Sequence, residues 1–283
     1  MGRNSSIEWT HHTFNPWWGC VRVSPGCKNC YADTWARRMG LDLWGKNAPR
    51  RFFSEAHWKE PLRWNQEAQE ERIRRRVFCA SMADVFEDRI DLEPWRLRLW
   101  TIIDQTPWLD WLLLTKRPQR IESVVPWRDK WPRNVWLGTT AENQRWAEIR
   151  LPVLLRYSAA VLFVSAEPLI GPLDLRRFLL PNGQGRRLNW VIAGGESGAK
   201  ARPMNPQWAR DLRDQCSRAR VPFHFKQWGH WSPEAIAAEP KVQRVTLTDK
   251  RGRPVVLVKV GKKASGRVLD GRTWDGLPQT SAA

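Results

Sequence analysis

Six short runs of apolar residues recur along the chain, and each is nearly continuous rather than alternating. Strands with this pattern are buried on both faces, as in a parallel sheet covered by helices. A further strand is expected at "TFNPWW" near the N-terminus. The six runs occupy residues 76–81, 111–115, 134–139, 161–165, 189–195 and 222–227.

Helical patterns separate these runs. Residues 91–104 place apolar side chains at helical spacing behind Asp91, the expected N-cap, and residues 205–219 do so behind Asn205 and Pro206. The strands recur roughly every 25 to 35 residues, which is the length of one βα unit. The pattern predicts an α/β fold, a full or partial (β/α) barrel of about six to eight parallel strands, with an open doubly wound sheet as the alternative.

The pattern changes after Trp231. Residues 242–261 indicate a β-hairpin that turns at Asp249 to Gly252 and carries many basic side chains. We therefore expect a barrel domain at residues 1–231 and a basic C-terminal extension, packed on the barrel, at residues 232–283.

Polar side chains follow the predicted strands directly. In a parallel barrel the carboxyl ends of all strands lie on one face, where active sites are built. Six strands that end in this way predict a site at that face. The residues concerned are Ser81 and Asp84; Lys116; Glu142 and Asn143; Glu167; Gly194, Gly195, Glu196 and Ser197; and Lys226 and Gln227.

Three of the five cysteines, Cys20, Cys27 and Cys30, lie within eleven residues, in the spacing C-x6-C-x2-C. A turn at Pro25–Gly26 and the two-residue gap allow the last two sulfurs to face one metal. The N-terminal residues are polar and give no secretory signal, so disulfides are not expected. Cys79 and Cys216 fall on apolar faces, and we expect both in the core.

Cysteine thiolates suit two metals, and the spacing leaves both open. A structural zinc would need a fourth ligand, for which His11, His12 or His57 are the candidates. A [4Fe–4S] cluster held by three cysteines would instead leave one iron open to a small molecule.

The charge of the chain is strongly positive, with 47 Lys and Arg against 29 Asp and Glu, or +18. Ten of the basic residues lie between residues 241 and 272, where only Asp249 and Asp270 are acidic, and a second cluster, "ERIRRR", ends at Arg76. Such a charge favours DNA or RNA as a partner. No apolar run approaches the ~20 residues of a membrane span. We expect a cytoplasmic protein with no membrane partner.

A β/α barrel with a three-cysteine loop after its first strand resembles the radical S-adenosylmethionine (SAM) enzymes. More closely, the chain is similar to a phage- and prophage-associated family of uncharacterised proteins proposed to be radical-SAM-like. The stretches that carry this resemblance are "IEWT", "FNPWWGCVRVSPGCKNCYA", "SMADVFED", "LLTKRP", "NVWLGTTAEN", "FVSAEPLIGPLDL", "NWVIAGGESGAKARPM", "DQC", "PFHFKQWG" and "GRVLDGRTWD".

The resemblance implies an enzyme with a [4Fe–4S] cluster on Cys20, Cys27 and Cys30. The open iron would bind SAM, and an electron donor would drive cleavage of its C–S bond to give a radical that abstracts hydrogen from the substrate. From their location, Ser81, Asp84, Gly194, Gly195, Glu196 and Ser197 would contact SAM. Lys116, Glu142, Asn143, Glu167, Lys226 and Gln227 would orient the substrate, for which the charge suggests a nucleobase in DNA or RNA.

Two other functions fit the same residues. One is a non-catalytic nucleic-acid-binding protein in which the three-cysteine loop holds a structural zinc. The other is a barrel enzyme that uses a metal for hydrolysis, which the scarcity of histidine ligands disfavours.

Overall fold

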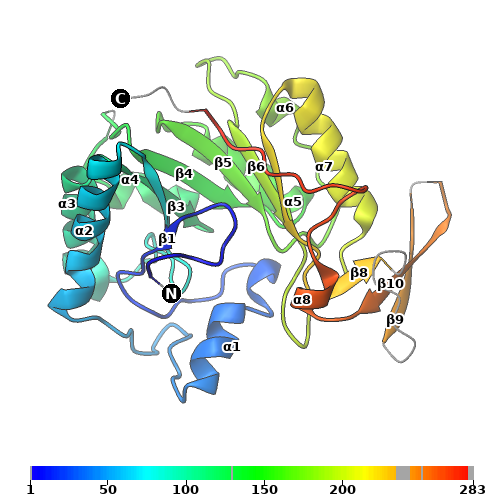
Figure 1. The fold of residues 1–283 in the computed structure, drawn as a ribbon, viewed down its shortest axis with the longest axis horizontal. Helices are drawn as coiled ribbons and strands as arrows, with labels where there is room; N and C mark the ends of the chain where they lie inside the picture. Colours follow the sequence, from blue (N-terminus) through cyan, green and yellow to red (C-terminus); the bar gives the residue numbers. More distant parts are fainter. Residues whose placement is uncertain (1, 129, 234–242, 250, 280–283) are drawn as a thin grey trace. The chain divides into compact units, whose positions relative to one another are not determined.

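The computed structural model describes residues 2–128, 130–233, 243–249 and 251–279 (Figure 1). The chain forms two compact units. Unit 1 comprises residues 1–24, 32–139 and 152–162, and unit 2 comprises residues 25–31, 140–151 and 163–283. The division at residue 231 that the sequence suggests stays a prediction.

Seven parallel strands follow one another in the order β1 to β7 without reversal. This is the strand order of a β/α barrel, whereas a doubly wound sheet reverses its order at a switch point. Within the described residues β7 does not pair with β1, so the barrel is partial, and the predicted fold class is confirmed. The strands are β1 (His12–Thr13), β2 (Arg75–Cys79), β3 (Leu109–Thr115), β4 (Val135–Thr140), β5 (Val161–Ala166), β6 (Trp190–Gly194) and β7 (Phe223–Gln227).

The longer helices are α2 (Glu55–Glu71), α3 (Glu93–Gln105), α5 (Gln144–Leu154) and α7 (Pro206–Ala219). Shorter ones are α1 (Tyr31–Arg38), α4 (Ile121–Val124), α6 (Arg176–Leu179) and α8 (Lys262–Ser265), with 3-10 turns at Pro25–Cys27, Ile90–Leu92 and Pro118–Arg120. Among the described residues, no helix combines the length and the apolar character needed to span a membrane.

The prediction of Asp91 as a helix cap was wrong. Asp91 lies inside the 3-10 turn at Ile90–Leu92, and its carboxylate accepts hydrogen bonds from the Arg89 guanidinium. Helix α3 therefore begins after Leu92, without a side-chain cap. The cap predicted at Asn205 is confirmed, because its side chain accepts a hydrogen bond from the Gln207 N–H.

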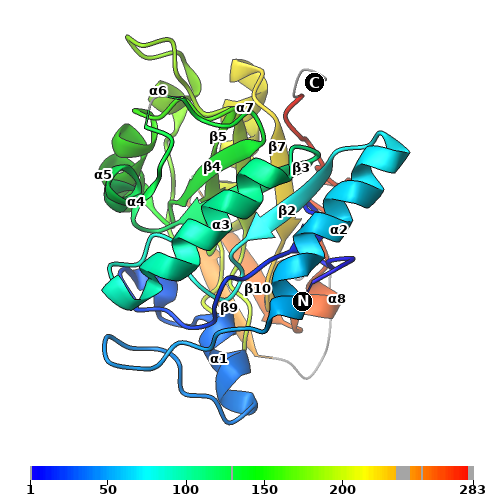
Figure 2. The same cartoon turned by 90° about the vertical axis from the view of Figure 1, so that its left-hand side faces the viewer.

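In unit 1, helix α2 packs against β2, β3 and α3 (Figure 2). Its core is aromatic: the Phe14 ring stacks on His57 with centroids 4.7 Å apart, and it meets Trp58 and Trp111 edge to face at 5.3 and 5.7 Å. Offset and edge-to-face aromatic pairs add to the stability that burial alone provides. The chain has 20 tryptophans, and they make up most of the largest fully buried side chains, so packing accounts for many of them.

The first strand is shorter than the sequence predicts. Strand β1 ends at Thr13, and the backbone then turns away from the sheet. The N–H of Trp18 donates to the carbonyl of Arg51, and the N–H of Gly19 donates to that of Met82. The stretch that contains Pro16 is therefore a loop that leads directly to Cys20.

In unit 2, helix α7 packs against β6 and β7, and Cys216 on its inner face is fully buried, as expected. A separate antiparallel sheet has the order β8 (Trp231–Pro233), β10 (Pro254–Lys259) and β9 (Arg244–Thr248). The β9–β10 pair confirms the predicted hairpin.

The C-terminal segment, drawn in red in Figure 1, pairs with the edge of β7. The N–H of Phe225 donates to Trp274 O (2.9 Å), and the N–H of Gly276 donates to Phe223 O (3.0 Å). The indole of Trp190 adds a bond to Gly276 O at 2.7 Å. An edge strand with unpaired N–H and C=O groups invites aggregation, so this segment protects the sheet.

We expect Gly276→Val to weaken this pairing. A Cβ at residue 276 would lie 2.7 Å from the carbonyl oxygen of Phe223, so the segment would have to shift off the edge. Overpacking of this kind costs about 1–3 kcal/mol of unfolding free energy, measurable by urea denaturation. The control is Gly183→Val, where an added Cβ meets nothing within 4 Å. Equal stabilities of the two variants would contradict the prediction.

Two histidines of unit 1 are held in the neutral form. The Nδ1 of His11 accepts a hydrogen bond from the Arg76 N–H at 2.8 Å, and the Nδ1 of His12 accepts one from the Asn4 N–H at 3.3 Å. Burial, with added repulsion from nearby positive groups, lowers the pKa of each to about 4. Protonation of either ring would put a hydrogen on its Nδ1, which could then no longer accept the hydrogen bond from the backbone N–H.

Stability should therefore fall as the pH drops. Between the usual histidine pKa of 6.5 and the folded value of about 4, the unfolded chain binds more protons than the folded chain, so the unfolding free energy declines across that window. Replacing His12 by Phe keeps a ring beside Trp64, which His12 stacks on, but removes the titration. Urea denaturation over this pH range should show a shallower decline for the variant, and parallel pH profiles would refute the assignment.

Candidate functional site

In unit 1, the carboxylate of Asp84 joins the ends of β2 and β3. It accepts hydrogen bonds from Thr115 Oγ1 (2.8 Å), from the Lys116 N–H (3.0 Å) and from Arg117 Nη1 (2.8 Å). Asp84 is 5% exposed, so these bonds compensate a buried charge. The residue predicted to contact SAM thus braces the strand ends.

Arg117 connects this carboxylate to the cysteine loop. Its Nη2 donates to Val21 O at 2.6 Å, and its Nη1 lies 3.7 Å from the Cys20 sulfur. Burial raises the pKa of the Cys20 thiol to about 12, although the positive charge of Arg117 opposes the shift. A metal at Cys20 would have to displace the thiol proton.

Ser81 lies in a buried network with Asn15. The Asn15 amide nitrogen donates to Ser81 Oγ at 3.1 Å, and its carbonyl oxygen accepts from the Met82 N–H at 2.7 Å. This network fixes the loop after β2 beside the loop that leads to Cys20.

In unit 2, the turn that carries Cys27 and Cys30 is held by a buried carboxylate. The Gly26 N–H donates to Glu142 Oε1 at 3.1 Å, and Glu142 Oε2 pairs with Arg150 Nη1 at 2.9 Å. Glu142 is 0% exposed, and the Arg150 guanidinium lies 4.1 Å from the centre of the Trp146 ring. A Cβ at residue 26 would lie 3.1 Å from this carboxylate, so glycine permits the close approach.

A second carboxylate, that of Glu196, holds the same turn from the end of β6. It accepts hydrogen bonds from Asn29 Nδ2 at 2.9 Å and from the backbone N–H and Nε of Arg202 at 2.8 and 2.9 Å. Arg202 in turn donates to Pro25 O at 3.0 Å. The two-cysteine turn is therefore clamped at Pro25, Gly26 and Asn29.

The ends of β5 and β7 form a partly accessible polar group in unit 2. Lys226 Nζ lies 2.7 and 2.8 Å from the two carboxylate oxygens of Glu167. Gln227 Nε2 donates to Glu167 Oε1 at 3.2 Å and to Ser197 Oγ at 2.9 Å. Glu167 and Lys226 keep 18% and 12% of their side chains exposed, so a ligand can reach them.

The remaining predicted residues have visible local roles. Asn143 caps the start of α5, where its Oδ1 accepts from the Trp146 N–H at 3.3 Å. A Cβ at Gly195 would overlap the carbonyl oxygen of Trp228, and one at Gly194 would be in contact with Glu167. Gly195 therefore allows the backbone after β6 to approach the end of β7 closely, whereas the contacts at Gly194 are of ordinary length.

The arginines that make this framework were not predicted as a group. Arg50–Glu87 and Arg117–Asp84 pair in unit 1, and Arg150–Glu142 and Arg202–Glu196 pair in unit 2. The partners stand 37, 33, 8 and 6 residues apart in the chain. None of these separations is the i,i+3 or i,i+4 spacing that would reveal a pair in the sequence.

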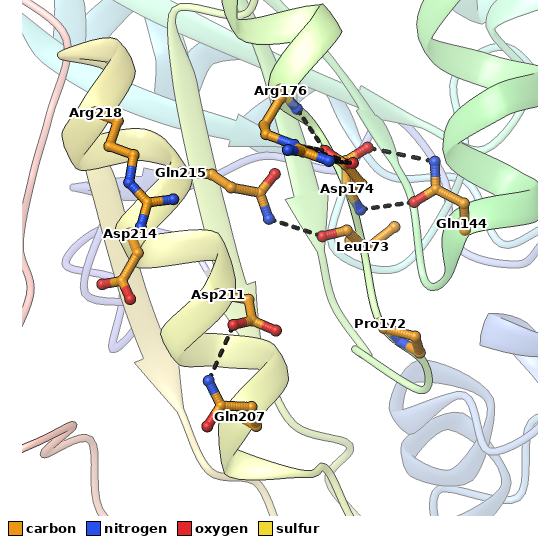
Figure 3. A pocket seen from close by; sticks show the side chains of 10 residues that line it. All are labelled: Gln144, Pro172, Leu173, Asp174, Arg176, Gln207, Asp211, Asp214, Gln215 and Arg218. Carbon is orange, nitrogen blue, oxygen red and sulfur yellow. Dashed lines mark hydrogen bonds and ion pairs between the residues drawn. The ribbon is translucent and has the colours of Figure 1, made fainter. Parts of the chain in front are cut away.

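A surface groove of about 870 Å³ in unit 2 contains none of the predicted site residues. Figure 3 shows it between α7 and the segment at 172–176. Its glutamines hold that segment: Gln144 bonds both backbone groups of Asp174, and Gln215 bonds the Leu173 carbonyl and the Leu175 N–H. These polar groups brace the loop, and we assign the groove no chemistry.

Cysteine thiols, once deprotonated, are suitable ligands for zinc or for an iron–sulfur cluster. None of the five cysteines is in a disulfide, and Cys20, Cys27 and Cys30 are only partly buried. Among the described residues, no three His, Cys, Asp or Glu side chains are already grouped to hold a metal ion.

The histidines suggested as a fourth zinc ligand are engaged elsewhere. Besides the bonds of His11 and His12, the Nε2 of His57 lies 2.9 Å from the Asn15 carbonyl. One ring nitrogen of each histidine is thus bonded to a backbone group, and the metal that the thiols bind stays a prediction.

These observations define the class of protein: a partial β/α barrel whose strand ends carry arginine–carboxylate braces and a three-cysteine loop. Residues 4–278 match the family described as "Protein of unknown function (DUF5131)", and the chain belongs to that family. Membership in an uncharacterised family, expected from the sequence, is confirmed, while phage association stays a prediction.

A search of the curated proteins found no significant match. The chain is similar to solved structures of spore photoproduct lyase. One, complexed with dinucleoside spore photoproduct, is 12% identical, with 92% of this chain and 71% of that chain covered and a TM-score of 0.46. A mutant with bound AdoMet and dinucleoside spore photoproduct is 12% identical, with 92% and 73% covered and a TM-score of 0.43.

We expect the Glu142–Arg150 pair to be strongly coupled. Glu142→Ala leaves a buried guanidinium uncompensated and should lower the unfolding free energy by about 3–5 kcal/mol, and Arg150→Met should also destabilise strongly. The double variant should lose less than the sum of the two, measured by urea denaturation.

A second measurement follows the cysteine turn. Without Glu142, the Gly26 N–H loses its acceptor, so iodoacetamide should label Cys27 faster relative to buried Cys216. Arg145→Ala, on the exposed side of α5, is the control. Additive stability losses together with unchanged labelling would show that Glu142 does not hold the turn.

Proposed function

We propose that this protein is an iron–sulfur, SAM-dependent radical enzyme that modifies or repairs a nucleobase in DNA or RNA. The observation that carries the proposal is the clamped turn of Cys27 and Cys30. Two buried carboxylates at strand ends hold the turn, one at the Gly26 N–H and one at the Asn29 side chain, while its thiols form no disulfide and are only partly buried. A disulfide or a core position would have made these sulfurs useless as ligands.

Cys20, Cys27 and Cys30 would hold a [4Fe–4S] cluster. The bound cluster supplies one-electron reduction of SAM, which needs an electron donor and enables abstraction of hydrogen from a carbon of the substrate. The positive charge of Arg117, 3.7 Å from the Cys20 sulfur, would offset the negative charge of the thiolate. A cluster with three protein ligands is one that keeps a position open.

The strand-end residues divide into two roles under this proposal. Asp84, Glu142, Asn143, Ser81 and the backbone of Lys116 hold the loops around the thiols. Glu167, Lys226, Gln227 and Ser197 form a partly accessible group with a carboxylate, an ammonium, an amide and a hydroxyl. These side chains can orient the polar groups of SAM or of a base by hydrogen bonding and charge.

The positive charge supports a polyanionic substrate. A base in a duplex would have to leave the stack to reach a site at strand ends, as in other enzymes that act on bases. The cytoplasmic location and the electron donor remain parts of the proposal.

The test is anaerobic reconstitution with iron and sulfide. We expect a brown protein with about four irons per chain. It should release 5′-deoxyadenosine from SAM under reducing conditions. Alanine at any of Cys20, Cys27 or Cys30 should abolish the visible absorbance, whereas Cys216→Ala, on the buried face of α7, should keep it. A colourless chain with one tightly held zinc would favour the zinc-binding module, and a fully loaded cluster that never yields 5′-deoxyadenosine would overturn the proposed chemistry.

A further inference from the structure

In the β9–β10 hairpin of unit 2, strand β10 is buried more deeply than strand β9. Leu257 is fully buried in a small core with Trp231 and Ala201, and Val245, Leu247 and Val255 pack against it. In β9 these apolar side chains alternate with Arg244, Thr246 and Thr248, all of which are exposed. The outer face of β9 is thus polar and basic.

The tip of the hairpin carries further positive charge. Asp249 accepts hydrogen bonds from the N–H groups of Arg251 and Arg253, and its carboxylate pairs with the Arg253 guanidinium. The carboxylate is therefore committed to closing the turn, and Arg251 is exposed beside it.

The short helix α8 adds to this end of unit 2. Lys262 and Lys263 are exposed on it, and it lies next to β8, at the base of the hairpin (Figure 1). Among the described residues, no carboxylate pairs with Arg251, Lys262 or Lys263. The other acid of the region, Asp270, is occupied by Arg210 and Arg213.

The second basic cluster of the sequence differs from the hairpin in this respect. In that cluster Arg74 pairs with Asp110, and Arg75 pairs with Glu71. Much of its charge is neutralised within the fold, so the hairpin end is the stronger candidate for a polyanion.

The hairpin is also joined to the loop that follows β6. Lys259 Nζ donates to Ala199 O, and Asn205 Nδ2 donates to Thr248 O at 2.9 Å. On the cysteine turn, Asn29 Nδ2 donates to Lys200 O at 2.8 Å. The loop at residues 197–202 therefore connects the hairpin with the clamped turn inside one unit.

We propose that the basic surface formed by Arg244, Arg251, Lys262 and Lys263 binds the phosphodiester backbone of a nucleic acid. Lys and Arg contacts to phosphates supply affinity without reading sequence. The exposed positions of β9 carry threonine rather than the large apolar side chains that enter a bilayer, which disfavours a lipid surface. That this nucleic acid is the substrate rests on the function proposed above.

The test measures the affinity of the full chain for three fluorescently labelled probes: duplex DNA, single-stranded DNA and an RNA hairpin. Binding is measured by fluorescence anisotropy over a series of salt concentrations. The hairpin variant combines Arg251→Glu and Lys262→Glu. The control variant combines Arg63→Glu and Arg218→Glu, which make the same change in total charge at exposed positions on α2 and α7. The hairpin variant should bind at least about ten-fold more weakly. If two phosphate contacts are lost, the slope of log K against log salt should shrink by about 1.8.

The control variant should bind close to wild type, and the three probes identify whether DNA or RNA is preferred. Equal losses in both variants would mean that only the overall charge matters and would overturn the proposal. Binding to phosphatidylserine vesicles without binding to any nucleic acid would do so as well. Iron content measured in the same variants separates the two proposals. A hairpin variant that loses nucleic-acid binding but still loads the cluster supports the nucleic-acid site proposed here. If the chain loads no cluster but still binds nucleic acid at the hairpin in a salt-dependent way, only the proposed radical chemistry is overturned.

Discussion

Buried arginine–carboxylate pairs at the strand ends are the constraint on which the rest of the structure depends. A charge removed from water is strongly unfavourable unless it is paired and hydrogen-bonded, so each pair forces particular loops to stay together. The Glu142–Arg150 pair is the clearest case, with side-chain exposures of 0% and 1%. Because its carboxylate also accepts the Gly26 N–H, the position of the cysteine turn is tied to the cost of exposing that charge.

The same reasoning divides the strand-end residues by what they can still bind. Asp84 accepts hydrogen bonds from three consecutive residues at the end of β3, Thr115 to Arg117, which leaves it little capacity for a ligand. Glu167 and Lys226 pair as well, but they keep part of their surface in contact with solvent. The residues that hold the loops and those that can bind a ligand are thus of the same types, and they differ in how deeply their side chains are buried.

The C-terminal residues of unit 2 serve two physical purposes. The segment around Trp274 and Gly276 satisfies the backbone groups at the edge of β7. In the hairpin before it, strand β9 packs Val245 and Leu247 against a small core and exposes Arg244, Thr246 and Thr248 on its other face. A short extension can therefore cover a sheet edge and present charge at once, because strand side chains alternate between faces.

The sequence by itself determined the strands, their parallel arrangement, the hairpin, and the core positions of Cys79 and Cys216, because these follow from local periodicity. It also placed polar residues at the strand ends, since a parallel sheet brings those ends to one face. It failed at Asp91 and at the length of the first strand, where backbone bonds to distant residues decided the outcome. Only the tertiary structure decided which carboxylates hold the loops in place. Their partners are Arg117, Arg150 and Arg202, and these pairs form on folding without any regular spacing in the chain.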